Sequence, residues 1–142
     1  MPEAGYSGTP LLKKLGAKDG QTALLIGVPD DVRALNAFDG WSRVKRVKTP
    51  RGISGAAFDY AHFFTRDLAA LEKTLPKLKA VIAPAGMIWI SWPKKSSGVA
   101  STVSEGDVRT LALHIGLVDV KVCAVDDIWS GLKLVIPVKD RP

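Results

Sequence analysis

Residues 58–92, FDYAHFFTRDLAALEKTLPKLKAVIAPAGMIWISW, contain the pattern that decides the fold. Residues 58–64 form an almost uninterrupted apolar run, which is typical of a strand buried on both faces. Leucines then recur at helical spacing, so we expect a helix that Thr65 caps and that is interrupted near Pro76. A second apolar run at 87–92 follows the turn APAG. Strand, helix and strand in this order predict a parallel pair.

The segments on either side continue this alternation. Residues 21–28 form a third apolar run, and a helix capped by Asp30 or Asp31 is expected over residues 32–38. Farther along the chain, Ser104 and Asp107 form a capping box for a helix that ends at Gly116. Each of these segments adds a strand or a helix to the same layered arrangement.

The end of the chain lacks this alternation. Residues 117–125 and 132–138 are expected to be strands joined by a turn near 129–131, and no helix separates them. They therefore predict an antiparallel hairpin. The sequence as a whole predicts an α/β fold: a three-layer sandwich whose sheet is mostly parallel and ends in this hairpin. We expect one domain over residues 1–142, with residues 1–20 as an N-terminal cap segment that contains a short helix begun at Thr9.

Residues 43–48, RVKRVK, predict only a weak strand, because their valines do not alternate cleanly with polar residues. The loop that follows, residues 49–57, is shorter than the dozen or so residues that a parallel crossover normally requires. We therefore expect this strand to be antiparallel or to lie outside the main sheet.

The composition is that of a globular protein, with 46% hydrophobic and 24% charged residues and a net charge of +6. The single cysteine, Cys123, excludes an internal disulfide and fits a reducing compartment. The first residues lack the pattern of a signal peptide, and no apolar run approaches the ~20 residues of a membrane span. We expect a cytoplasmic protein without a membrane partner.

Positive charge is densest in one run of basic residues that contains no acid. Its members are Arg43, Lys45, Arg46, Lys48 and Arg51. Such a run is a weak signal for nucleic-acid binding, and it equally fits a charged sheet edge that discourages pairing with other chains. Nucleic acid is therefore the least favoured partner that we consider.

The stretch WPKKSSG lies where a ligand site is expected, since open α/β sheets bind ligands outside the carboxyl ends of their strands. The candidate ligand-binding residues are Lys94, Lys95, Ser96, Ser97, Gly98, Asp126 and Trp129. The lysines would meet an anionic group, the serines and glycine would donate hydrogen bonds, and the tryptophan would cover a flat ring. The alternative is structural: the lysines pair with carboxylates that we expect at the same edge, which are those of Asp30, Asp31, Asp126 and Asp127.

The sequence offers no catalytic or metal-binding pattern. His62 lies within an apolar run and His114 beside the apolar face of a helix, so we favour structural roles for both. Cys123 falls in the middle of a strand and is expected to be buried and inert. Two histidines and one cysteine provide no metal-binding spacing. We assign no catalytic residue, no metal and no cofactor.

Residues 58–92 and the closing hairpin together resemble the second half of a Rossmann-like methyltransferase core. The strings AGYSGTPLLKKLG, WPKKSSGV and KVCAVDDIWSGLKLV resemble a small bacterial family known only as a domain of unknown function, over nearly the whole chain. The methyltransferase resemblance implies S-adenosylmethionine at a glycine-rich turn after the first strand, where the backbone approaches the cofactor. Here that stretch, LLIGVPDDV, has only Gly27, and RVKRVKTPR supplies no acid for the ribose hydroxyls.

Three functions follow from these observations. The first in rank is a non-catalytic module that binds a small anionic ligand or a protein partner. The alternatives are a divergent S-adenosylmethionine-dependent methyltransferase and a nucleic-acid-binding protein. Open sheet edges and four tryptophans leave room for a homodimer.

Overall fold

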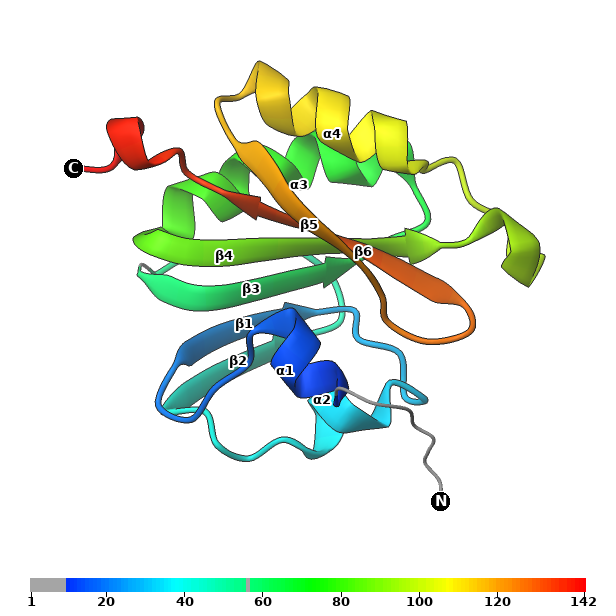
Figure 1. Cartoon of the computed structure of the whole chain (residues 1–142), viewed down its shortest axis with the longest axis horizontal. Coiled ribbons are helices and arrows are strands. Elements are labelled where there is room, and N and C mark those ends of the chain that lie inside the picture. The colour runs from blue at the N-terminus through cyan, green and yellow to red at the C-terminus, as the bar shows by residue number, and fades with distance from the viewer. Residues whose placement is uncertain (1–9, 56) are drawn as a thin grey trace.

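The computed structural model describes residues 10–55 and 57–142, which form a six-stranded sheet between two layers of helices (Figure 1). The strands are β1 (Thr22–Ile26), β2 (Arg43–Val47), β3 (Phe58–Phe64), β4 (Ile82–Pro93), β5 (Val118–Ala124) and β6 (Trp129–Val135). The helices are α1 (Leu11–Leu15), α2 (Arg33–Ala37), α3 (Leu68–Val81) and α4 (Glu105–His114). Thr9, the expected cap of the first helix, lies outside the described residues.

The sheet has the strand order β2-β1-β3-β4-β6-β5. Strands β1 to β4 pair in parallel, whereas β6 is antiparallel to both of its neighbours, β4 and β5. The prediction of a mostly parallel sheet that ends in an antiparallel hairpin is therefore confirmed. No helix within the described ranges is long and apolar enough to span a bilayer.

The expectation for residues 43–48 is wrong, because β2 belongs to the main sheet and pairs in parallel with β1. The short parallel connection has a physical explanation. The segment between β2 and β3 crosses over β1 without forming a helix, and its Ile53 packs against the core in place of one. A loop thus covers the face of the sheet that a helix usually covers in a parallel crossover.

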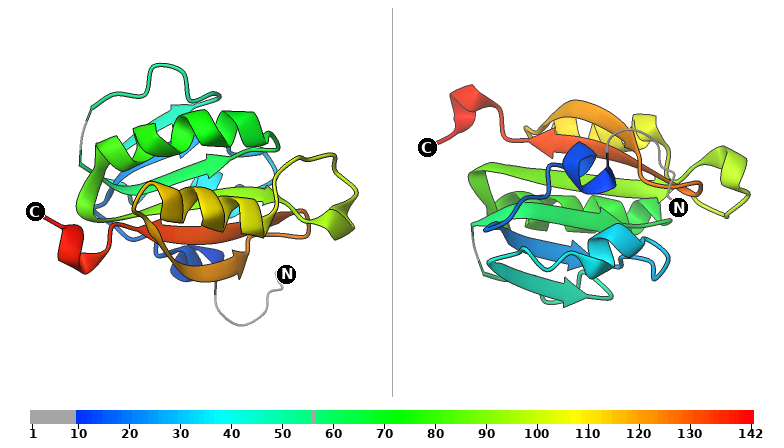
Figure 2. Two further views of the ribbon diagram at one scale, coloured as in Figure 1. Left: turned by 90° about the horizontal axis from the view of Figure 1, so that it is seen from above. Right: turned by 60° about the horizontal axis from the view of Figure 1, so that its bottom comes forward.

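The helices divide the interior into two apolar clusters. On one face α3 and α4 lie side by side (Figure 2). Leu75 of α3 and Val108 of α4 belong to the apolar cluster on this face. On the other face the shorter α1 and α2 cover an aromatic cluster that contains Tyr60 and Trp89. The Trp89 indole N–H donates to the Leu15 carbonyl at 2.8 Å, which ties α1 to β4.

Four local details differ from the expectation. Asp67, not Thr65, caps α3 by accepting the Ala69 amide, whereas Thr65 Oγ1 accepts the amide of Asp67 itself. The helix also continues through Pro76, although a proline removes one of its hydrogen bonds. No side chain caps α2. The hairpin turn lies at residues 125–128, just before the expected position.

Candidate functional site

The carboxyl ends of β1, β2, β3 and β4 meet at one edge of the sheet, because these strands are parallel. From β1 the chain continues to α2, which covers one face, and from β3 to α3, which covers the other. Strand order therefore reverses between β1 and β3. Ligands of open α/β sheets bind outside the carboxyl ends at such a reversal.

Gly27 lies directly at this reversal. Its φ of +68° is in the left-handed region, which a glycine adopts without steric cost. A Cβ here would lie 3.2 Å from the Phe64 carbonyl oxygen and 3.4 Å from that of Lys48. The Gly27 amide donates to the Val47 carbonyl at 2.8 Å. Gly27 thus brings the ends of β1, β2 and β3 together at a point with little room for a side chain.

A hollow of about 270 Å³ opens beside Gly27, between the ends of β1 and β2. Its apolar wall includes Leu25 and Val28, and its polar residues are Asp30, Asn36, Arg46 and Lys48. The hollow is close to the lower end of the ~300–1,000 Å³ that is usual for small-molecule sites. The hollow combines an apolar wall with one negatively charged residue, Asp30, and two positively charged residues, Arg46 and Lys48.

The turn after β1 is held by hydrogen bonds from a single side chain. Asn36 Nδ2 donates to the carbonyl oxygens of Pro29 at 2.9 Å and of Asp30 at 3.3 Å. Among the residues that the structure describes, none donates a hydrogen bond to the Asp30 carboxylate, which is exposed. The carboxylate is therefore available to a ligand in the hollow.

A buried polar chain links β3 and β4 below this edge. The Tyr60 hydroxyl lies 2.8 Å from His62 Nδ1, and the Ser91 hydroxyl lies 2.7 Å from His62 Nε2. Burial lowers the pKa of His62 to about 3 and raises that of Tyr60 well above its usual value. The imidazole is therefore neutral, fully buried and hydrogen-bonded on both nitrogens. This environment fits the structural role expected for His62.

The WPKKSSG end of β4 is closed by internal hydrogen bonds. Lys94 Nζ donates to the Asp126 carbonyl at 2.7 Å, and the Lys94 amide donates to the Ile128 carbonyl at 2.7 Å. Asp126 Oδ1 accepts the amides of Ile128 and Trp129 at 2.9 and 2.7 Å. The predicted residues Lys94, Asp126 and Trp129 thus come together. Lys94 and Asp126 stabilise the hairpin turn through these hydrogen bonds.

The other predicted ligand-binding residues lie in a short 3₁₀ turn, Lys95–Ser97. Ser97 Oγ donates to the Lys94 carbonyl at 2.6 Å and accepts the Val99 amide, so it stabilises this turn. Lys95, Ser96 and Gly98 are exposed. Ligand binding by these residues stays a prediction.

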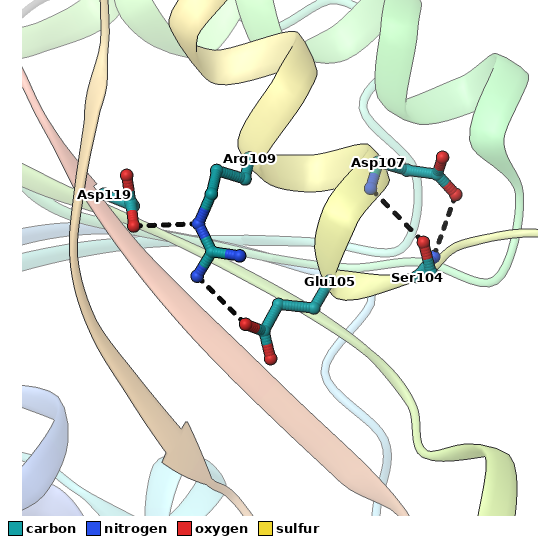
Figure 3. A network of polar contacts seen from close by, with 5 residues as sticks. All are labelled: Ser104, Glu105, Asp107, Arg109 and Asp119. Carbon is teal, nitrogen blue, oxygen red and sulfur yellow. Dashed lines mark hydrogen bonds and ion pairs between the residues drawn. The ribbon is translucent and has the colours of Figure 1, made fainter.

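Pairing of Lys94 or Lys95 with carboxylates, the structural alternative, does not occur within residues 10–55 and 57–142. Both ion pairs of this part of the chain belong to Arg109, which contacts Glu105 and Asp119 at 2.9 Å each (Figure 3). Ser104 and Asp107 in the same view form the predicted capping box. Lys94 is instead partnered by a main-chain oxygen.

The basic run lies on and just after β2, at the edge of the sheet opposite the hairpin. Its members Arg43, Lys45, Arg46, Lys48 and Arg51 are all exposed. The register divides them between the two faces. Arg46 pairs with Leu25 on the face of α1 and α2, whereas Lys45 pairs with Leu24 on the face of α3 and α4. Nucleic-acid binding by this run stays a prediction.

Sequence reasoning placed Asp30 at the right edge but missed Asn36 and the hollow itself. It also missed the partnership of Ser91 with His62. Ser91 and His62 are polar residues within otherwise apolar runs. This pattern could have indicated that their buried side chains are hydrogen-bonded to each other.

No protein-family model matches this chain, and no curated protein matches it. Several solved structures are similar to this chain. A SAM-dependent methyltransferase from Aquifex aeolicus is 19% identical, with a TM-score of 0.64 over 89% of this chain and 88% of that one. A TehB-like SAM-dependent methyltransferase from Corynebacterium glutamicum is 14% identical, with a TM-score of 0.58 over 89% and 85%. Magnesium protoporphyrin IX methyltransferase from Synechocystis, solved with bound SAH, is 11% identical, with a TM-score of 0.59 over 89% and 78%.

The chain therefore has the Rossmann-like fold of S-adenosylmethionine-dependent methyltransferases, and the resemblance noted in its sequence extends to the whole core. These neighbours also correct the ranking of functions. The non-catalytic binding module that we placed first is contradicted, because several of the similar structures are methyltransferases.

Proposed function

We propose that this protein is a divergent S-adenosylmethionine-dependent methyltransferase whose cofactor binds in the hollow beside Gly27. The observation that carries the proposal is the position of this hollow, outside the ends of β1 and β2 and next to the reversal of strand order, in a chain with a methyltransferase fold. When bound, the cofactor would supply a methyl group on a positively charged sulfur.

The residues present fit the chemistry of this cofactor, although their charges are arranged differently from the pattern that the resemblance implies. Asp30 follows β1 and offers a carboxylate to ribose hydroxyls or to the ammonium group. Lys48 follows β2, where an acid is expected, and offers a cation to the carboxylate of the methionine portion. Leu25 and Val28 provide the apolar wall for the adenine ring.

The residues of the chain do more than bind. Asn36 holds the turn that carries Asp30, and Gly27 keeps the strand ends close to the hollow. His62 takes no proton from a substrate, because it is buried and its pKa is about 3. The proposal therefore assigns binding and positioning roles and no general base.

We further propose that the chain is a bacterial, cytoplasmic protein of the small family that its sequence strings resemble. This part rests on the strings quoted above and on the single cysteine.

The test is a thermal-shift titration with S-adenosylmethionine, S-adenosylhomocysteine and a panel of nucleotides. At ~100 times the dissociation constant, a ligand stabilises the folded protein by about 2.7 kcal/mol, which corresponds to several degrees. We expect a shift with the first two compounds alone. The matched variants are Asp30→Asn, which should weaken binding about 10-fold or more, and Asp31→Asn, which should not. Both carboxylates are exposed neighbours, but only Asp30 lines the hollow. Absence of a shift at millimolar cofactor would refute the proposal.

A further inference from the structure

A second hollow, of about 450 Å³, lies on the opposite face of the sheet, between the segment after β2 and α3. Arg51 contributes from the segment after β2, and Lys73 and Lys77 contribute from α3. The two lysines are four residues apart, so their side chains are neighbours on one side of the helix. Residues distant in sequence thus bring positive charge to one place.

The strand register extends this charge across the sheet edge. Thr22 pairs with Arg43 and Leu24 with Lys45. Leu24 belongs to the cluster under α3 and α4, so both basic residues project on the same face as the hollow. We call this surface the basic face, and its residues are Arg43, Lys45, Arg51, Lys73 and Lys77. All of them are exposed.

The charges of the basic face are not neutralised by ion pairs. In the part of the chain that the structure describes, none of these side chains lies within ion-pair distance of a carboxylate. Glu72, which also lies on α3, lines the groove toward α4 instead. Asp67 borders the hollow, but its carboxylate accepts the Ala69 amide as the helix cap. Asp59, at the start of β3, accepts the Thr22 amide.

Lys73 and Lys77 repel each other across one turn of α3. Like charges at this spacing destabilise a helix by a few tenths of a kcal/mol, and no ion pair offsets this among the residues that the structure describes. A row of exposed cations without partners matches a row of phosphates, which is the electrostatic footprint of nucleic-acid backbones. Sequence alone ranked nucleic acid last because it did not reveal that Lys73 and Lys77 join the basic run.

We propose that the basic face binds the phosphate backbone of a nucleic acid. The inference stands apart from cofactor binding, since the basic face and the hollow beside Gly27 lie on opposite faces and share none of the residues assigned to them. Backbone contacts fix the position of a strand without reading its sequence, so the expected binding depends on salt more than on base sequence.

The experiment measures fluorescence anisotropy of short labelled RNA and DNA strands, without cofactor, between about 50 and 200 mM salt. If all five basic side chains contact phosphates, the slope of log affinity against log salt concentration should be about −3.5 for single strands and about −4.5 for duplex DNA. The separate RNA and DNA strands show which backbone is preferred. Polyglutamate serves as the acidic-polypeptide probe.

The matched variants remove equal charge from different places. Arg51→Ala/Lys73→Ala/Lys77→Ala empties the hollow of cations and should lower the magnitude of the salt slope by about 2 to 3. Lys13→Ala/Lys18→Ala/Lys139→Ala removes exposed lysines outside the basic face and should lower it far less. Both variants should retain the circular dichroism of the wild type. No binding at about 50 mM salt, equal losses in the two variants, or equally tight binding of polyglutamate would overturn the proposal.

Discussion

The two ends of the candidate edge differ in what their polar groups contact. At the end of β4, Lys94 and Asp126 are bonded to main-chain groups of the hairpin turn. At the ends of β1 and β2, Asp30 and Lys48 line an open hollow. Both ends looked similar in the sequence, since each carries charged residues after an apolar run. A charged strand end therefore indicates a ligand site only where the fold has left its charges without internal partners.

The largest expected effect comes from His62 on β3, the strand that lies between these two ends. Because the folded-state pKa of His62 is lowered from 6.5 to about 3, the unfolded chain binds a proton that the folded chain excludes. The stability that His62 contributes is therefore complete above pH ~6.5 and falls by about 1.4 kcal/mol per pH unit as the pH drops toward 3. Urea unfolding of His62→Gln and of the exposed control His114→Gln between pH 7 and pH 4 measures this slope.

The pH slope should flatten in His62→Gln and persist in His114→Gln. If His62→Gln does not fold, NMR of the wild-type imidazoles gives the same information, because His62 should not titrate between pH 8 and pH 5. Titration of His62 near its ordinary pKa would contradict the burial of His62 between Tyr60 and Ser91.

The second test compares two left-handed glycines, one at each end of the edge. Gly27 has φ +68° and is crowded by two carbonyl oxygens, whereas Gly98 has φ +76° and open space around it. Gly27→Ala should lower the free energy of unfolding by about 2 kcal/mol or more, and Gly98→Ala by about 1 kcal/mol, because only Gly27 adds crowding to backbone strain. Urea denaturation midpoints measure both. Equal effects would mean that the strand ends beside Gly27 are less tightly packed than described.

The third test concerns the two adjacent lysines of the closed end. Lys94→Ala removes a hydrogen bond to a partly buried carbonyl and should lower the free energy of unfolding by about 1–2 kcal/mol. Lys95→Ala should change it by less than about 0.5 kcal/mol, because Lys95 is exposed. Calorimetric unfolding compares the two variants. A larger loss for Lys95 would show that the internal bonds of this end are assigned to the wrong lysine.

Much of the fold could be predicted from local sequence. The bounds of β3 are those of its apolar run, and the capping box of α4 was visible as Ser104 and Asp107. The position of β2 could not be predicted, because a rule on crossover length assumes that a helix must cover the strand. In this protein Ile53 of a loop covers it.

The site was less predictable, since it depends on which side chains share a face. Arg46 and Lys48 were noticed only as part of a basic run. The separation of Arg46 from Lys45 follows from the register of β2 against β1, and Lys48 lines the hollow beside Arg46. Lys94 and Asp126 were correctly placed together, but the bond from Lys94 to the Asp126 carbonyl joins residues distant in sequence and has no local signature. Burial and register, which arise from the whole fold, decide both cases.

NMR distinguishes a ligand site beside Gly27 from one at the WPKKSSG end. In amide spectra recorded during titration with S-adenosylmethionine, we expect the largest chemical-shift changes at Gly27, Val28, Asp30 and Lys48. The amides of Lys95, Ser96 and Gly98 should change little. Changes concentrated on Lys95, Ser96 and Gly98, or no changes at all, would show that S-adenosylmethionine does not bind beside Gly27.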